Sequence, residues 1–141
     1  MVMGERVIMS REILFKAKRK DNGEWVEGQY VYITNPLTED GKPIKHLICN
    51  GTNIFNDLID PDTLCQFTGL TDKNGKKIWE NDILCIGENA KLMVSWHHFK
   101  ASWVLSKKGW MYNHFFGESV EPEDVEAVGN IFDNADLLEV E

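Results

Sequence analysis

The stretch that decides the fold is Gln66 to Leu84, which reads QFTGLTDKNGKKIWENDIL. Its centre, Asp72 to Gly75, is a strong turn signal, because Asn and Gly tolerate the positive φ that a tight hairpin turn requires. Apolar residues lie on both sides of the turn and can brace it across two strands: Phe67, Leu70, Ile78 and Trp79. The stretch therefore predicts a β-hairpin.

Polar residues interrupt the apolar pattern directly after the hairpin, at Glu80 to Asp82, before a short aliphatic run from Ile83 to Ile86 that ends at Gly87. Such a run predicts a buried strand. Two interpretations of the polar residues stay open: they shape the turn and the elbow, or they form a ligand site from Asp72, Glu80 and Asp82. We favour a structural role for the whole motif, which comprises Thr68, Gly69, Asp72, Asn74, Gly75, Trp79, Glu80 and Asp82.

The same stretch resembles the YopX family of small bacteriophage and prophage proteins, in which Q-[YF]-T-G-L-x-D-x-N-G-K-x-I-[YF]-E-G-D-I is the most recognisable pattern. Trp79 keeps the aromatic character of its position, whereas Asn81 stands where the family usually has Gly. The remaining matches are Gln66, Thr68, Gly69, Leu70, Asp72, Asn74, Gly75, Lys76, Ile78, Glu80, Asp82 and Ile83.

Two further segments resemble the ends of that family. Arg11 to Ala17 is similar to its opening strand, and Val128 to Asn134, followed by Leu137 and Leu138, is similar to its closing motif, although Ala135 stands where Pro is common. The resemblance implies a β-rich fold and expression from a phage or prophage genome. It implies no agreed biochemical activity.

A chain of 141 residues with five Trp, seven Phe and three Tyr has enough bulky side chains for a core without metals or disulfides. The three cysteines (Cys49, Cys65 and Cys85) form no CxxC pair, which favours reduced thiols in a cytoplasmic compartment. The resemblance implies that this compartment is the cytoplasm of a bacterial host. Nothing resembles a signal peptide, and no run approaches the roughly 20 apolar residues of a membrane span. We therefore expect no membrane segment.

The net charge of -8 is unevenly distributed. Glu118 to Glu141 contains nine acidic residues and no Lys or Arg, so the rest of the chain holds 15 basic and 14 acidic side chains. This balance argues against a broad nucleic-acid surface, which needs a basic face. The one basic concentration is interpreted as the solvated end of a hairpin: Lys16, Lys18, Arg19 and Lys20.

Short strands separated by turn residues predict a mostly β fold of two small intertwined β-subdomains, residues 1–60 and residues 61–141, with a turn at Ile59 to Thr63 between them. In the second subdomain, strands near 64–67, 83–87, 91–99, 101–106 and 127–132 are interpreted as an SH3-like barrel. Asn134 can cap a short C-terminal helix over Ala135 to Val140.

The chain offers little that is typical of catalysis. The adjacent His97 and His98 point to opposite faces of a strand, and no zinc-binding spacing or nucleophile elbow is present, so we expect no metal, no cofactor and no enzymatic activity. A minor alternative is a small hydrolase that uses Glu80 and Asp82 with His98.

Aromatic residues crowd the segment from Trp96 to Phe116. They either pack in the core or form a surface for a host or phage protein, or for a second copy of the chain. Single-stranded nucleic acid, stacked on the aromatics and held by Lys91, Lys100, Lys107 and Lys108, is a less favoured partner. The candidate binding residues are Trp96, Lys100, Trp103, Trp110, Tyr112 and Phe116. The leading hypothesis is a non-catalytic phage or prophage accessory protein that binds a protein.

Overall fold

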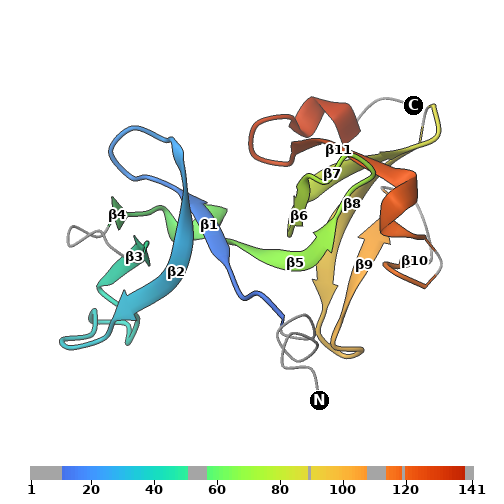
Figure 1. The fold of residues 1–141 in the computed structure, drawn as a ribbon. Helices are drawn as coiled ribbons and strands as arrows, with labels where there is room; N and C mark the ends of the chain where they lie inside the picture. The colour runs from blue at the N-terminus through green and yellow to red at the C-terminus, as the bar shows by residue number, and fades with distance from the viewer. Residues whose placement is uncertain (1–10, 51–56, 89, 108–113, 119, 139–141) are drawn as a thin grey trace, which may run out of the picture. The chain divides into compact units, whose positions relative to one another are not determined.

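The computed structural model describes residues 11–50, 57–88, 90–107, 114–118 and 120–138. These residues form eleven strands and three short 3-10 turns, arranged as two antiparallel sheets, so the predicted mostly β class is confirmed (Figure 1). The contacts between Cα atoms divide the chain into two compact units, Met1–Leu64 and Cys65–Glu141.

Unit 1 contains four strands in the order β4-β3-β2-β1. Each neighbouring pair is antiparallel, and β1 pairs with β2 across the turn at Asp21 to Gly23, where Gly23 has a φ of 73°. The hairpin end that the sequence predicts beside the basic residues is therefore present, and its Asn-Gly pair supplies the positive φ that the turn requires. The strands are β1 at Phe15–Lys18, β2 at Trp25–Ile33, β3 at Lys45–Cys49 and β4 at Asp57–Leu58.

A small apolar cluster of Ala17, Ile48 and Ile59 forms the core of unit 1, with half-buried side chains packed around it. Gly28 lies in the middle of β2 at a point where β3 approaches closely, because a Cβ atom there would sit 2.3 Å from Cys49 O. The close contact between these two strands therefore depends on the absence of a side chain at this position.

Unit 2 begins with a hairpin of β5 (Cys65–Thr71) and β6 (Lys77–Trp79), in which Phe67 faces Trp79. The remaining strands form a sheet in the order β10-β9-β8-β7-β11. Its last strand in the sequence, β11, returns to pair with β7. The bounds are β7 at Asp82–Ile86, β8 at Ala90–His97, β9 at Ser102–Ser106, β10 at His114–Phe115 and β11 at Val125–Asn130.

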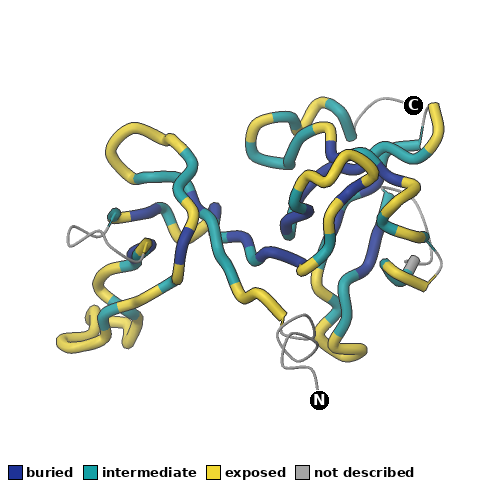
Figure 2. Tube along the Cα trace, in the orientation of Figure 1, coloured by how far each residue is buried: buried dark blue, intermediate teal, exposed yellow. Residues whose placement is uncertain are grey.

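The core of unit 2 is larger than that of unit 1. Seven buried side chains form one apolar cluster, and the half-buried Trp103 and Phe116 pack against it. Figure 2 shows the contrast between the buried strands and the exposed hairpin turns. The members of the cluster are Ile78, Leu84, Leu92, Val94, Leu105, Val125 and Ala127.

Two details of the predicted fold differ from the structure. The described residues of unit 2 form an open sheet with β10 and β11 at its edges rather than a closed barrel. The expected C-terminal helix is a single 3-10 turn at Ala135–Leu138, and Asn134 Oδ1 accepts a hydrogen bond from Asn130 N instead of capping an α-helix. Leu137 N donates to Asn134 O at 2.9 Å, and this bond between residues three apart closes a 3-10 turn rather than an α-helical one.

The boundary between the two units falls after Leu64, directly beyond the turn at Ile59 to Thr63. The segment from Ile59 to Thr63 belongs to unit 1 because it is bonded to β1. Asp60 N donates to Lys18 O at 2.9 Å, and Thr63 Oγ1 accepts from Lys18 N at 2.9 Å. These two bonds hold the 3-10 turn at Pro61–Thr63 beside the first hairpin.

Candidate functional site

The side chain of Asp72, in the central motif, accepts three hydrogen bonds from backbone N–H groups. Its Oδ1 accepts hydrogen bonds from Asn74 N and Lys76 N, each at 2.9 Å, and its Oδ2 accepts one from Ala127 N at 3.0 Å. Burial raises the pKa of this carboxyl group, but the three backbone donors outweigh it and hold the pKa below its ordinary value. The side chain therefore fixes the turn that contains Asn74 and Gly75 and joins this turn to β11.

Glu80 and Asp82 also use their carboxylates on the backbone. Asp82 Oδ2 accepts from Trp79 N at 2.9 Å, and Glu80 Oε1 accepts from Gln66 N at 3.1 Å. Burial raises the pKa of Glu80, and the bond from Gln66 only partly offsets this effect. Both acids thus hold the elbow that follows β6.

The other residues of the motif have comparable structural positions. Thr68 Oγ1 donates to Ile78 O at 2.8 Å across the hairpin, and the ring of Trp79 lies 5.5 Å from that of Phe67. Gly69 has a φ of 87°, within the bulge of β5. Asn81 takes a φ of 71° at the elbow, a conformation that Asn tolerates better than most residues.

The structure does not bring together the three side chains of the hydrolase alternative. Ile83, next to Asp82, faces Met93 in the register of β7 and β8, and His97 lies four residues beyond Met93. Four strand residues span about 13 Å, and His98 follows them in the hairpin turn. Among the described residues, no three His, Cys, Asp or Glu side chains are grouped closely enough to hold a metal ion.

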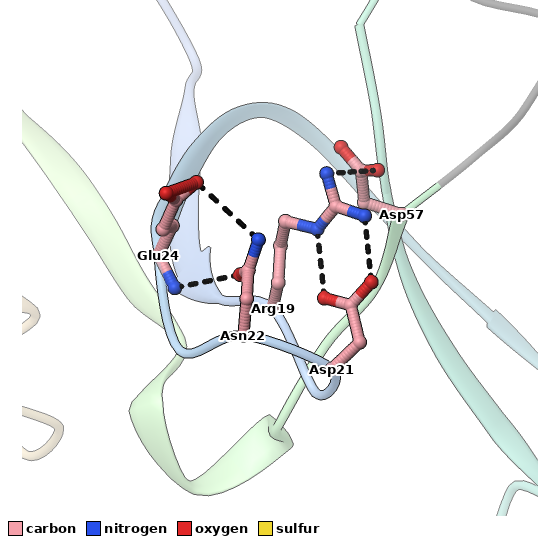
Figure 3. Close-up of polar contacts among 5 residues, drawn as sticks. All are labelled: Arg19, Asp21, Asn22, Glu24 and Asp57. Carbon is pink, nitrogen blue, oxygen red and sulfur yellow. Dashed lines mark hydrogen bonds and ion pairs between the residues drawn. The ribbon is translucent and has the colours of Figure 1, made fainter.

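The basic residues at the first hairpin include an ion-pair cluster (Figure 3). Arg19 Nη2 lies 2.8 Å from Asp21 Oδ2, Arg19 Nε donates to Asp21 Oδ1 at 3.0 Å, and Arg19 Nη1 lies 3.5 Å from Asp57 Oδ1. The hydrogen bond from Arg19 lowers the pKa of Asp21. Arg19 therefore joins the hairpin turn to β4.

Lysines beside this cluster contact an aromatic ring. Lys16 Nζ and Lys18 Nζ lie 4.6 and 5.5 Å from the ring centroid of Trp25, which is on the same face of the β1–β2 hairpin. The predicted solvated hairpin end is therefore partly organised by cation–π contacts.

The aromatic residues proposed for binding lie in different environments. Trp103 packs against the core, whereas Trp96, opposite it on β8, is 45% exposed, and the two ring centroids are 5.0 Å apart. Phe116 is half-buried against the same core. Trp110 and Tyr112 lie outside the described residues.

The end of β8 and the turn that follows it carry a group of side chains that we call the hairpin-tip surface, all of them exposed except the half-buried His97: Trp96, His97, His98, Phe99 and Lys100. Phe99 is 82% exposed, and its ring centroid lies 4.1 Å from that of His98. His97 Nδ1 lies 3.2 Å from Lys100 N, which fixes this ring beside the turn. Sequence reasoning missed Phe99, because the strand pattern extended to residue 99 and gave no signal that the turn begins at His98.

An open hollow of about 430 Å³ adjoins the hairpin-tip surface. Ser102 lies in its wall, and Ser102 Oγ is buried without a hydrogen-bond partner among the residues that the structure describes. The hollow brings together Lys100 and Phe116 from the predicted binding set with residues that the sequence did not indicate. Its lining residues are Lys100, Ser102, Phe115, Phe116, Gly117 and Glu118.

Within the described part of the chain, no helical segment has the length and apolar content needed to span a membrane.

Comparison with known proteins shows similarity to a protein family and to solved structures. The family described as YopX protein matches residues 14–139. The crystal structure of protein EF1440 from Enterococcus faecalis has a similar fold, with 20% sequence identity and a TM-score of 0.53 over 92% of this chain and 99% of that chain. Among curated proteins, none is a significant match. Because the family match spans nearly the whole sequence, and because it includes the central motif and both end segments, this chain belongs to the YopX family.

Proposed function

We propose that this chain is a non-catalytic accessory protein, encoded by a phage or prophage and acting in the bacterial cytoplasm, that binds a protein partner through the hairpin-tip surface. The observation that carries the proposal is the exposure of large aromatic side chains at one end of the β8–β9 hairpin, Trp96 at 45% and Phe99 at 82%. Aromatic side chains of this size that are exposed in the free protein gain favourable burial when a partner covers them. Such side chains are typical anchors of protein interfaces.

The chemistry of the central motif supports the same proposal. Its carboxylates are bonded to backbone N–H groups, which leaves them poorly suited to act as bases or metal ligands. The partner is a host protein, a phage protein or a second copy of this chain. An SH3-like arrangement of the strands in unit 2 is part of the proposal, since such small β folds commonly present binding residues on their turns.

The proposal is tested by chemical cross-linking in the bacterial host, followed by purification of the tagged full-length chain. Wild type should retain a defined partner, and Phe99→Ser should reduce its yield by about tenfold, as expected for an aromatic anchor. Tyr32→Ser is the matched control, because Tyr32 is a 55% exposed aromatic residue in unit 1. Absence of a partner from wild type, or equal yields from wild type and Phe99→Ser, would contradict the proposal.

A second candidate, single-stranded nucleic-acid binding, is favoured by the contacts of Lys16 and Lys18 with Trp25. A ring beside two ammonium groups provides a stacking face together with phosphate contacts. Filter binding of an oligothymidylate at low and high salt tests it. Binding that falls steeply with salt and is lost in Trp25→Ala would support this candidate over the protein partner.

A further inference from the structure

The hollow beside β10 combines opposite charges with two aromatic rings. Lys100 stands on the β8–β9 turn and Glu118 on the turn after β10, and both are exposed. Between them, Phe115 and Phe116 contribute apolar surface. A volume of about 430 Å³ lies within the range of sites that hold small ligands or single anchoring side chains.

Ser102 provides a polar group in the wall of this hollow. It begins β9 opposite His97, and its buried hydroxyl has no hydrogen-bond partner among the described residues. A buried hydroxyl without a partner is costly and rare in folded proteins. A ligand oxygen that reached this hydroxyl would supply the missing hydrogen-bond partner.

The charges of unit 2 favour a peptide over a nucleic acid as the occupant. Glu118 lies at the hollow, and it begins the segment that holds nine acidic residues and no Lys or Arg. Successive phosphates would be repelled by these acids. A peptide needs only one negative group near Lys100, and its backbone N–H groups can donate to Glu118.

We propose that the hollow lined by Lys100, Ser102, Phe115 and Phe116 binds an extended segment of the partner protein that carries one carboxylate side chain next to an apolar side chain. The carboxylate pairs with Lys100 Nζ, and the apolar side chain contacts the two Phe rings. Ser102 Oγ donates to an oxygen of the bound segment. This inference rests on the proposed function, because it specifies the partner of the same region.

Selection of random heptapeptides displayed on phage against the full-length protein tests this inference. Peptides with an Asp or Glu beside an apolar residue should be enriched on wild type. On Lys100→Glu the preference should change to peptides with Lys or Arg at the same place, because the cation that attracts the carboxylate is replaced by an anion. Lys42→Glu is the matched control, since Lys42 is a highly exposed cation in unit 1. Enrichment without an acidic residue, or an identical motif on Lys100→Glu, overturns the inference.

A second test of the inference is the affinity of wild type and the variants for the most enriched peptide, measured by fluorescence anisotropy. Lys100→Glu should weaken binding by about tenfold and Ser102→Ala severalfold, whereas Lys42→Glu should bind as wild type does. Near-ultraviolet circular dichroism checks that each variant is folded.

If cross-linking of the partner in cells depends on Phe99 but is unchanged in Lys100→Glu, the hollow is not the peptide site and the proposed function stands. If neither variant affects cross-linking, the proposed function fails as well.

Discussion

At the scale of single residues, Asp72 determines the position of two separate segments. Its carboxylate satisfies three backbone N–H groups, two in its own turn and one at Ala127, while the side chain is 5% exposed. A carboxylate in such a position is tolerated because charge-assisted hydrogen bonds replace its hydration.

Removal of this side chain should be costly. Asp72→Ala leaves the buried N–H of Ala127 and the two turn N–H groups without their acceptor, so we expect the free energy of unfolding to fall by about 3 kcal/mol. Urea titration followed by Trp fluorescence measures it. Asp124→Ala, at an exposed position, should change the same quantity by no more than about 0.5 kcal/mol. A loss below about 1 kcal/mol in Asp72→Ala would show that these bonds contribute little.

Glu80 and Asp72 should make opposite contributions to the pH dependence of stability. The pKa of Asp72 is below its ordinary value of 3.8 in the folded state, so its contribution is present above pH 3.8 and is lost as the pH falls through the folded pKa. The pKa of Glu80 is raised above 4.5, so its contribution is full below pH 4.5 and is lost as the pH rises through the folded pKa.

Glu80→Gln tests the second contribution. The amide keeps an oxygen that can accept from Gln66 N but cannot ionise. The free energy of unfolding of the variant, relative to that of wild type, should therefore increase from pH 4 to pH 7. Urea titrations of both proteins at the two pH values measure this difference. A difference that is independent of pH would indicate that the folded-state pKa of Glu80 is not raised.

At the scale of elements, the pairing of β2 with β3 depends on Gly28. A Cβ atom at this position would lie 2.3 Å from Cys49 O and 3.0 Å from Ile48 Cγ2, and the first of these is a backbone atom of the neighbouring strand. Since a backbone atom in a paired strand cannot move without disturbing its hydrogen bonds, even the smallest side chain should separate the two strands.

Gly28→Ala should therefore destabilise unit 1 by about 2 kcal/mol or more, despite the better strand propensity of Ala. Thermal unfolding followed by circular dichroism measures the effect. Glu27→Ala, at the exposed neighbouring position of β2, is the control and should be nearly neutral. Equal unfolding midpoints for Gly28→Ala and Glu27→Ala would mean that a Cβ atom at position 28 does not disturb the pairing of β2 with β3.

At the scale of the whole molecule, the two units have cores of different size. The apolar cluster of unit 1 has three buried members, Ala17, Ile48 and Ile59, whereas that of unit 2 has seven. Because local stability follows the amount of buried apolar surface, unit 1 should open more often than unit 2. Amide hydrogen exchange should be slowest in β7, β8 and β9 and faster in β3. Equal protection in β3 and β8 would contradict this expectation.

Local chemistry in the sequence determined the elements of both units. The Asn-Gly turns at Gly23 and Gly75 and the short alternating runs beside them predict the observed hairpins, because positive φ and two-residue periodicity act over a few neighbouring positions. Asn81 stands where the resembled family usually has Gly, and its φ of 71° lies in the left-handed region that Asn tolerates better than most residues. The strand positions in unit 2 follow for the same reason.

Only the tertiary structure decided which distant groups meet. The bond from Ala127 N to Asp72 joins residues 55 positions apart, and the return of β11 beside β7 gives an open sheet where the sequence suggested a closed barrel. The exposure of Phe99 likewise depends on how strands and turns are placed around it, and so does the Ser102 hydroxyl, which has no partner among the described residues. Sheet closure and burial are set by strand stagger and by contacts between remote segments, which no local pattern of residue types specifies.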